Sequence, residues 1–342
     1  MRAAIYNREK GIPEVVEVPI PEIGDDEILL KPMAVGVCGS EVVSSNLAGP
    51  GSFGHEPAGI VAQAGSKVKN VKEGDRVFVH HRVACLACHY CRRGYYTMCS
   101  KYKEYGFDPS AYAEYTRVLA RNVELDTIKL PKHVTFDEGC LIEPLATVWR
   151  AVKRTNIQIG DSVLIIGAGF AGLAAVQIVR IFGAGLVGIC DLIDYKLDLA
   201  NKLGADLGIN PKNQDALEVF RAANEGRKAD IVLVIAGSIA ALEQGIQLTE
   251  KGGTVTQYGV SEKDETISLV PFDLLHAEVT YSPSYSSSPI DTKEVAGFLF
   301  LGKIIGLPLI SHHFGLNQIV EALELKKKAT DSIKILIHPH DQ

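Results

Sequence analysis

Apolar and polar positions follow two different patterns along the chain, and the pattern changes near Cys140. In the first third, short runs rich in β-branched residues occur at 59–65 and 75–83, separated by turn sequences such as "EGD". Short runs of this kind predict antiparallel strands that form a barrel-like β domain.

Beyond Cys140, wholly apolar runs alternate with segments of helical spacing. Buried strands are predicted at 162–169, 186–191, 229–237 and 252–260, and helices at 170–183, 195–205 and 241–252. This alternation is typical of βαβ units and predicts a doubly wound parallel sheet, so the fold class is α/β. The Ser- and Pro-rich stretch Ser282–Pro289 marks the exit from this domain, and a short strand follows at 332–339.

Length and charge narrow the classes of function. A chain of 342 residues suits two domains, and its net charge of −6 favours neither a nucleic-acid nor a membrane partner. No apolar run after Met1 is long enough for a signal peptide or a membrane span, so we expect a cytoplasmic protein. Seven cysteines in such a chain indicate metal or catalytic thiols rather than disulfides.

The glycine pattern G-A-G-F-A-G lies between a predicted strand and a predicted helix, and its glycines are Gly167, Gly169 and Gly172. Such glycines allow a tight turn and the close approach of a pyrophosphate to the helix N-terminus. Asp191 ends the next strand, where a carboxylate accepts hydrogen bonds from the adenosine ribose and repels a 2′-phosphate. The pattern therefore predicts NAD binding; the alternative is a glycine turn with Asp191 as a helix cap.

Four cysteines, Cys85, Cys88, Cys91 and Cys99, lie close together with C-x2-C-x2-C-x7-C spacing. Four thiolates at this spacing can surround one Zn²⁺ tetrahedrally and form a closed, structural site. Iron–sulfur ligation and a redox-active pair are the alternatives, although no C-P sequence follows the fourth position. The basic residues of this lobe are interpreted as a solvated loop rather than a nucleic-acid surface.

A second group of metal-ligating residues flanks a polar loop. Cys38 precedes the loop, His55 and Glu56 follow it, and Glu143 lies near the domain junction. One thiolate, one imidazole and a carboxylate fit a catalytic zinc whose fourth position is left to water or substrate. His80 and His81 follow a predicted strand and are interpreted as surface residues.

Several motifs together resemble the zinc-containing medium-chain dehydrogenases. They are "GVCGS", "GHEPAG", "VKEGDRV", the four-cysteine lobe, "AYAEY", "IEPLAT", "GAGFAG" and the strand end at Asp191. The resemblance implies a GroES-like β-rich catalytic domain at 1–146, with a structural-zinc lobe at 85–99, completed by 288–342. It also implies a Rossmann NAD-binding domain at 147–287, an active site in the cleft between the domains, and a homodimer or homotetramer.

The resemblance also implies an activity, namely hydride transfer between NAD and a secondary hydroxyl of a small molecule. Glu143 occupies the position at which alcohol dehydrogenases of this family have a second cysteine ligand. Glutamate there, together with His55 and Glu56, resembles the polyol and sugar branch, which also includes threonine dehydrogenases. We therefore expect a polyhydroxylated substrate, such as a polyol, cyclitol or sugar. Either Glu56 or Glu143 is the direct zinc ligand.

Three further points follow from the resemblance. Ser40 keeps the first position of the family's proton relay, whereas Val43 replaces the usual histidine, and the loop before His55 is short. Thr147 is a predicted contact to the nicotinamide.

The alternative functions are a threonine or simple secondary-alcohol dehydrogenase, and a non-catalytic zinc- and NAD-binding sensor or structural protein.

Overall fold

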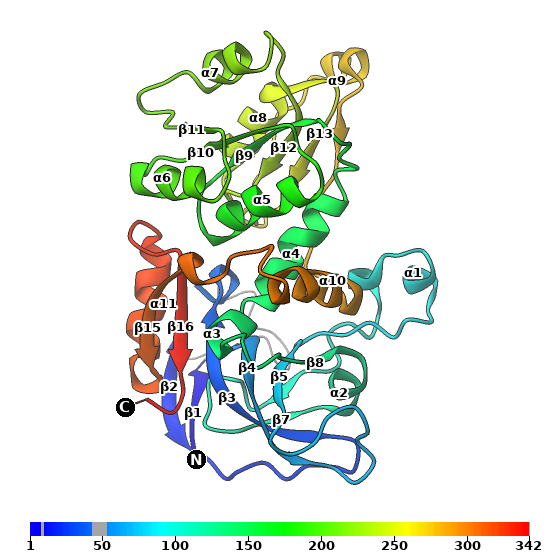
Figure 1. The fold of residues 1–342 in the computed structure, drawn as a ribbon, viewed down its shortest axis with the longest axis vertical. Helices are drawn as coiled ribbons and strands as arrows, with labels where there is room; N and C mark the ends of the chain where they lie inside the picture. Colours follow the sequence, from blue (N-terminus) through cyan, green and yellow to red (C-terminus); the bar gives the residue numbers. More distant parts are fainter. Residues whose placement is uncertain (8–9, 43–52, 342) are drawn as a thin grey trace. The chain divides into compact units, whose positions relative to one another are not determined.

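The computed structural model of the chain describes residues 1–7, 10–42 and 53–341. Its internal contacts divide the chain into two compact units (Figure 1). The first unit comprises Met1–Ala146 and Ser287–Gln342, and the second comprises Thr147–Ser286. The second unit is therefore inserted into the sequence of the first.

The first unit is built on two sheets. A two-stranded antiparallel sheet pairs β1 with β2, and an eight-stranded sheet has the path β15-β16-β3-β4-β5-β8, with β7 beside β3 and β6 beside β7. The strands are β1 (Arg2–Asn7), β2 (Ile12–Glu17), β3 (Ile28–Val37), β4 (Glu56–Ala64), β5 (Arg76–Val79), β6 (Phe107–Asp108), β7 (Thr116–Val118), β8 (Thr127–Lys129), β15 (Ile310–Gly315) and β16 (Lys334–His338).

The helices of the first unit range from single 3₁₀ turns to α10, which has 12 residues. They are η1 (Gly39–Val42), α1 (His89–Arg92), η3 (Tyr96–Met98), α2 (Ala120–Asp126), α3 (Phe136–Gly139), α10 (Pro289–Phe300), η4 (Leu307–Leu309), η5 (Leu316–Gln318) and α11 (Ile319–Lys328). Helix α4 (Ile142–Lys153) begins in the first unit and continues into the second. In Figure 1 the segment around α1 projects from the sheet as a separate lobe.

Register within the large sheet places chain segments that are far apart in sequence side by side. Strands β3 and β4 pair antiparallel with Gly36 opposite Glu56. Strand β16 pairs antiparallel with the other edge of β3, with Ile335 opposite Val37. The ends of β3, β4 and β16 therefore meet at one place. The apolar face of this sheet packs in a buried core that includes Phe53 and Tyr112.

The second unit contains one parallel sheet with the strand order β11-β10-β9-β12-β13-β14. Its strands are β9 (Ser162–Ile166), β10 (Leu186–Cys190), β11 (Leu207–Ile209), β12 (Ala229–Val234), β13 (Thr249–Gln257) and β14 (Thr280–Tyr281). This is the order of a doubly wound dinucleotide-binding sheet, in which ligands bind at the carboxyl ends of the strands where the order reverses. The predicted α/β fold class is confirmed.

Helices connect the strands of the second unit. The helices predicted at 170–183, 195–205 and 241–252 correspond to α5 (Phe170–Ile181), α6 (Asp194–Lys202) and α8 (Ile239–Leu248). Two further helices, α7 (Ala216–Ala223) and α9 (Pro271–Ala277), were not predicted. The helix predicted at 241–252 is too long, because it ends at Leu248 and β13 begins at Thr249. Thr249 has an extended backbone, which suits its β-branched side chain.

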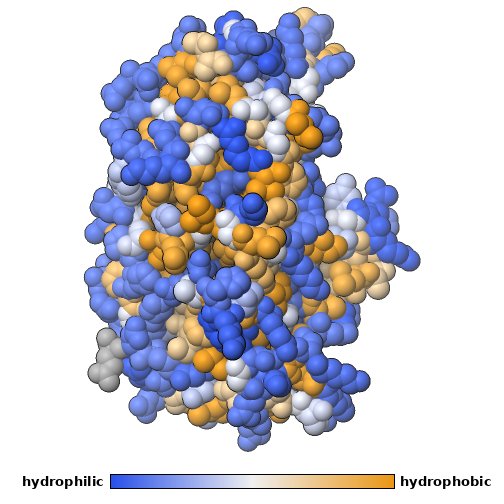
Figure 2. All heavy atoms as spheres, viewed as in Figure 1, coloured by the Kyte–Doolittle hydropathy of each residue, from blue (hydrophilic) through white to orange (hydrophobic). Residues whose placement is uncertain are grey.

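Charged and polar residues cover most of the face shown in Figure 2, with apolar side chains in scattered patches between them. Within the described ranges, every helix is too short or too polar to cross a membrane.

Candidate active site and metal sites

Cys38, His55 and Glu56 come together because β3 and β4 are neighbours in the sheet. Cys38 directly follows β3, His55 directly precedes β4, and Glu56 is the first residue of β4. One ligand atom from each of the three residues lies within 4.8 Å of the others. Gly36 leaves the space for the carboxylate, since a Cβ at this position would lie 1.9 Å from Glu56 Oε2. A thiolate, an imidazole and a carboxylate are a suitable donor set for Zn²⁺.

One buried atom of this group supports a metal site. Among the described residues, Glu56 Oε1 accepts no hydrogen bond, although it is buried. Burial lowers the pKa of His55, but the Cys38 sulfur and the Glu41 carboxylate outweigh burial and raise the pKa well above its usual range. The pocket thus favours positive charge at the imidazole. A divalent cation supplies such charge, and the residues fit a metal ion.

Glu41 holds this group in place, and it was not among the residues predicted from the sequence. Its carboxylate accepts hydrogen bonds from the backbone N–H groups of Cys38 and Gly54 at 3.0 and 2.7 Å, and from the Tyr112 hydroxyl at 2.8 Å. Glu41 Oε1 also lies 3.2 Å from His55 Nδ1. Carboxylates in this position orient metal-ligating histidines and increase their basicity.

Lys334 was also missed, and it forms an ion pair with Glu56 inside the first unit. Its side chain is 3% exposed and that of Glu56 is not exposed at all. Burial opposes the charge of Lys334, but the negative charges of Glu56 and Cys38 outweigh burial and raise the pKa of the ammonium group. The register of β16 beside β3 explains this contact, which joins positions 278 residues apart in sequence.

His80 and His81 are buried, so the prediction that they are surface residues is wrong. They are 0% and 5% exposed. Strand β5 ends at Val79, and the chain then turns inward, where His80 Nδ1 lies 2.9 Å from Asp126 Oδ2. The side chain of Asn122 donates a hydrogen bond to the His80 carbonyl at 2.7 Å.

Glu143 lies with these two histidines. Its Oε1 atom is 3.9 Å from His80 Nε2 and 3.9 Å from His81 Nδ1, and the His81 ring centroid is 4.7 Å from that of His55. Burial raises the pKa of Glu143, and burial together with the positive charge of His55 lowers the pKa of His81 well below its usual range. The candidate site therefore has two adjoining parts, one with Glu56 beside Cys38 and His55 and one with Glu143 beside the histidines.

The Ser40 hydroxyl donates a hydrogen bond to Cys38 Sγ at 3.2 Å. This contact places the Ser40 hydroxyl directly against the sulfur of a candidate zinc ligand. Val43 and most of the short loop that the sequence analysis singled out lie outside the described residues.

The four cysteines of the projecting lobe converge. Cys85 Sγ is 3.9 Å from Cys91 Sγ, and Cys88 Sγ is 3.5 Å from Cys91 Sγ. Four sulfurs around one Zn²⁺ at 2.3 Å would lie about 3.8 Å apart, so this geometry fits tetrahedral zinc. The backbone N–H groups of Ala87 and Cys88 lower the pKa of Cys85 to about 6, whereas burial raises the pKa of Cys91 to about 12. Bound metal would hold all four as thiolates.

In the second unit, the three glycines after β9 have different roles. Gly167 has a φ of +107°, which a side chain would strain, and a Cβ at Gly172 would lie 1.8 Å from the Gly167 carbonyl oxygen. Apart from Gly169 and its chain neighbours, no described residue has an atom within 4 Å of the Cβ position of Gly169, so the space beside it is open. Within the part of the chain that the structure describes, α5 begins at Phe170 with no side-chain cap hydrogen bond. The N–H groups of a helix N-terminus suit a pyrophosphate.

Asp191 lies directly after β10 and next to this loop. It accepts hydrogen bonds from the backbone N–H groups of Ala168 at 2.6 Å and Ile193 at 3.0 Å. These bonds fix the carboxylate at the strand end and leave each oxygen a further lone pair for a ribose hydroxyl. In the same unit, the Thr147 and Tyr258 hydroxyls are 2.8 Å apart.

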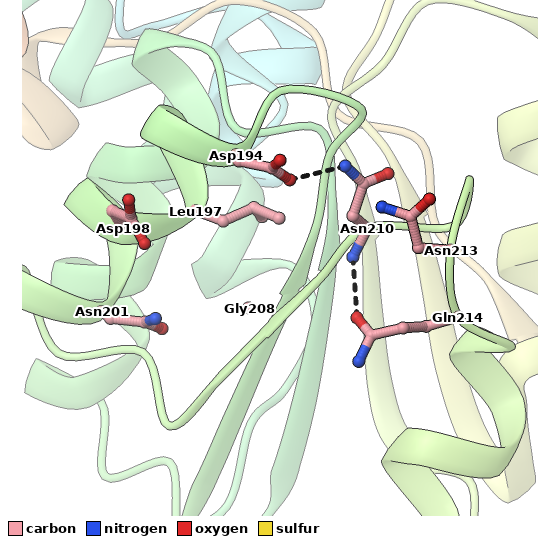
Figure 3. A pocket seen from close by; sticks show the side chains of 8 residues that line it. All are labelled: Asp194, Leu197, Asp198, Asn201, Gly208, Asn210, Asn213 and Gln214. Atoms are coloured by element: carbon pink, nitrogen blue, oxygen red, sulfur yellow. Dashed lines mark hydrogen bonds between the residues drawn. The ribbon is translucent and has the colours of Figure 1, made fainter.

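A hollow in the surface of the second unit lies between α6 and the segment after β11 (Figure 3). Its volume is about 400 Å³, and its walls carry acidic and amide side chains. Within it, Asn210 Nδ2 donates to Asp194 Oδ1 at 2.6 Å, and the Asn210 N–H donates to Gln214 Oε1 at 3.2 Å. The lining residues are Asp194, Leu197, Asp198, Asn201, Gly208, Asn210, Asn213 and Gln214.

The structure defines a class of nicotinamide-dependent metalloenzyme. Its three features are a GroES-like β unit, a doubly wound dinucleotide-binding unit and two donor sets suited to zinc. Comparison with known proteins agrees with this. Residues 24–132 match the family described as alcohol dehydrogenase GroES-like domain, and residues 171–300 match the family described as zinc-binding dehydrogenase.

Known proteins that align with nearly the whole chain support the same family. Sorbitol dehydrogenase of Bacillus subtilis is 31% identical over 99% of this chain and 98% of its own. L-threonine 3-dehydrogenase of Bacillus velezensis is 31% identical over 98% and 99%. A zinc-binding dehydrogenase structure from Sinorhizobium meliloti, bound to NADP, is 28% identical, covers 99% of this chain and 98% of its own, and has a TM-score of 0.88.

The chain belongs to the zinc-containing medium-chain dehydrogenases. It is a zinc-dependent alcohol dehydrogenase in the broad sense, and zinc and a nicotinamide dinucleotide are its cofactors.

Proposed function

We propose that the protein transfers a hydride between NAD and a secondary hydroxyl group of a polyhydroxylated small molecule, such as a polyol, cyclitol or sugar. One observation carries this proposal: among the described residues, the Cys38–His55–Glu56 group contains one cysteine, Cys38, and the site also holds the buried carboxylates of Glu56 and Glu143. Carboxylates accept hydrogen bonds from hydroxyl groups next to the reacting one, which a second thiolate does poorly. The site thus suits a substrate with neighbouring hydroxyls.

Cys38, His55 and Glu56 are the proposed zinc ligands, since their donor atoms lie together. Zinc, when bound there, supplies Lewis-acid charge that makes a hydroxyl group easier to deprotonate, and NAD supplies the hydride acceptor. Glu41 fixes the His55 ring, and Lys334 balances the buried charge of Glu56.

Glu143 and His81 are the residues proposed to position the substrate and exchange protons with it. Burial raises the pKa of Glu143, so its carboxyl group binds a proton at a higher pH than an exposed glutamate does. Acid–base groups work best when their pKa lies near the working pH. His81 stays neutral, because burial lowers its pKa, and a neutral imidazole can both donate to and accept from hydroxyl groups.

Ser40 is the proposed first group of the path by which the proton leaves. Its hydroxyl donates a hydrogen bond to the sulfur of Cys38, one of the proposed zinc ligands. The proposal predicts a solvent isotope effect that Ser40→Ala removes, as hydride transfer then limits the rate. Unchanged kinetics in this variant would exclude the route through Ser40.

NAD rather than NADP is the proposed cofactor, and Thr147 is a proposed contact to its nicotinamide. Asp191 is held at the end of β10, and Asp194 and Asp198 follow on α6. Leu192 and Ile193 follow Asp191 directly, where an arginine would be needed to accept a 2′-phosphate.

An amino-alcohol such as threonine is the second candidate substrate. The buried carboxylate of Glu143 favours it, since an ammonium group could pair with this carboxylate, and a threonine 3-dehydrogenase is among the relatives.

NADH formation by the zinc-replete protein tests the proposal. The substrates would be polyols, cyclitols, aldoses, threonine and simple secondary alcohols, and Cys38→Ser would serve as the blank. Turnover of one polyhydroxylated class, absent in the blank, is the expected result. Turnover of threonine alone would favour the second candidate. NAD binding without turnover of any compound would favour a sensor or structural protein.

A further inference from the structure

Asp137, His313 and His338 form a third group of metal-type side chains, apart from the catalytic group and the four-cysteine lobe. One donor atom from each of the three lies within 4.8 Å of the others. His338 Nε2 is 2.8 Å from Asp137 Oδ1, and His313 Nδ1 is 3.7 Å from Asp137 Oδ2. The two imidazole ring centroids are 5.1 Å apart.

Three separate elements of the first unit deliver these residues. Asp137 lies in α3, His313 in β15 and His338 at the end of β16. Strands β15 and β16 are parallel neighbours, which brings the two histidines to adjoining positions. In α3, Glu138 rather than Asp137 completes the capping box with Thr135. The Asp137 carboxylate therefore remains available to the histidines.

The surroundings of His338 are those of a metal-ligating histidine. Its Nε2 atom faces Asp137, and its other ring nitrogen, Nδ1, lies 3.4 Å from Asp341 Oδ2. Histidines that bind metals almost always donate the second ring N–H to a carboxylate, a carbonyl or water. A surface ion pair would need one imidazole and one carboxylate. Such a pair does not explain the second imidazole, that of His313, or the second carboxylate, that of Asp341.

The side chains of Asp137, His313 and His338 are 26%, 48% and 22% exposed. An ion from solution can therefore reach them, and water can fill the remaining coordination positions. Two imidazoles and one carboxylate select zinc and similar transition metals over Mg²⁺ and Ca²⁺, which require oxygen ligands.

We propose that Asp137, His313 and His338 bind a third Zn²⁺ ion at the surface of the first unit, with Asp341 orienting His338. The ion would join α3 to the last two strands of the sheet. Strand β16 also carries Lys334, the partner of Glu56, and the chain after α3 leads to Glu143 in α4. Zinc at this site thus stabilises two segments that form the walls of the catalytic group.

Equilibrium dialysis of the full-length, zinc-replete protein against micromolar Zn²⁺ tests the proposal, with bound zinc counted by elemental analysis. We expect one equivalent beyond the catalytic and four-cysteine ions. His313→Ala and Asp137→Asn should each weaken this equivalent by at least about tenfold, as loss of a metal-site residue does. His312→Ala is the matched control, because His312 contacts Ser311 and is not part of the group.

Thermal unfolding gives a second readout that does not depend on activity. Added Zn²⁺ should raise the Tm of the wild type and of His312→Ala, because binding to the native state stabilises it, and should raise that of His313→Ala less. His313 is about half exposed, so its replacement should leave the fold intact. A third equivalent that persists in both His313→Ala and Asp137→Asn would be an adventitious ion only. That result, or absence of the equivalent from the wild type, would overturn the proposal.

Discussion

Lys334 and Glu56 form an ion pair whose two side chains are almost wholly buried, and Glu56 is itself a candidate zinc ligand beside Cys38 and His55. Removing one partner of a buried pair leaves the other charge without compensation, which costs about 3–5 kcal/mol of stability. We therefore expect Lys334→Met to lower the free energy of unfolding by this amount in urea titrations of protein stripped of its catalytic zinc, in which no metal ion compensates the Glu56 carboxylate.

Lys327→Met is the control for the ion pair, because it removes the same charge from an exposed position on α11. Exposed substitutions of this kind usually change stability by less than about 0.5 kcal/mol. The double variant Lys334→Met with Glu56→Gln should recover part of the loss. Equal stability of Lys334→Met and Lys327→Met would show that the ion pair contributes nothing.

Glu41 is expected to control zinc affinity without binding zinc itself. Glu41→Gln keeps the shape of the side chain but removes the charge that faces His55 and one of the acceptor oxygens. Loss of such a partner typically weakens metal binding about 10- to 100-fold. Chelator competition, followed by zinc release, measures the change at the catalytic site.

Glu124→Gln is the matched control for Glu41, since Glu124 is exposed and pairs only with Arg121 in the described structure. It should release zinc as the wild type does. The four-cysteine zinc should be unaffected in both variants. If Glu41→Gln also retained catalytic zinc with wild-type affinity, Glu41 would have no role in holding the ligand.

Zinc bound by the four-cysteine lobe should stabilise the first unit and have no effect on the second. Cys91→Ser removes a buried ligand of this group, and structural zinc sites contribute free energy directly to folding. We expect the loss of one zinc equivalent and a lower Tm, with NAD binding to the second unit retained. Calorimetry and NAD titration measure the two effects. Cys38→Ser should lose a different zinc and keep the lobe intact, and coincident loss of NAD binding in Cys91→Ser would contradict the prediction.

The sequence predicts the second unit well because its signals are local. Gly167, Gly169 and Gly172 lie within one turn between a strand and a helix, and the parallel sheet follows from the alternation of apolar and amphipathic segments. The end of α8 was misplaced by four residues. The helical spacing there continues beyond Leu248, but Thr249 already belongs to a strand set by its partner in the sheet.

The candidate active site was predicted less completely, because part of it depends on strand register. Cys38, His55 and Glu56 carry motif signals, whereas Lys334 and Glu41 carry none. Lys334 reaches Glu56 only because β16 pairs with β3, a contact between distant segments that no local pattern specifies. His80 and His81 were assigned to the surface for the same reason: a strand end can turn outward or inward, and only the fold decides which.

Helix α9 is expected to form part of an interface between copies of the chain. None of its residues is buried, and Phe272 and Leu275 are 66% and 74% exposed. It precedes the short edge strand β14, and exposed edges with apolar neighbours are typical association surfaces. We expect the wild type to sediment as an oligomer in analytical ultracentrifugation, and Leu275→Asp to sediment closer to the monomer. Glu278→Gln, next to α9, is the control, and an unchanged mass for Leu275→Asp would exclude α9 from the interface.

Asp191 should determine the choice between NAD and NADP. Asp191→Asn keeps an oxygen that can accept the Ala168 N–H but removes the charge that would repel a 2′-phosphate. Two negative charges at hydrogen-bonding distance repel by about 4 kcal/mol near a protein surface, so removing one should raise the NADP-to-NAD ratio of kcat/KM by at least about tenfold. Steady-state kinetics with both cofactors measure the ratio. Glu218→Gln makes the same change of net charge on the exposed side of α7 and should leave the ratio unchanged. If both variants kept the wild-type ratio, the cofactor preference would have to come from other residues of the second unit.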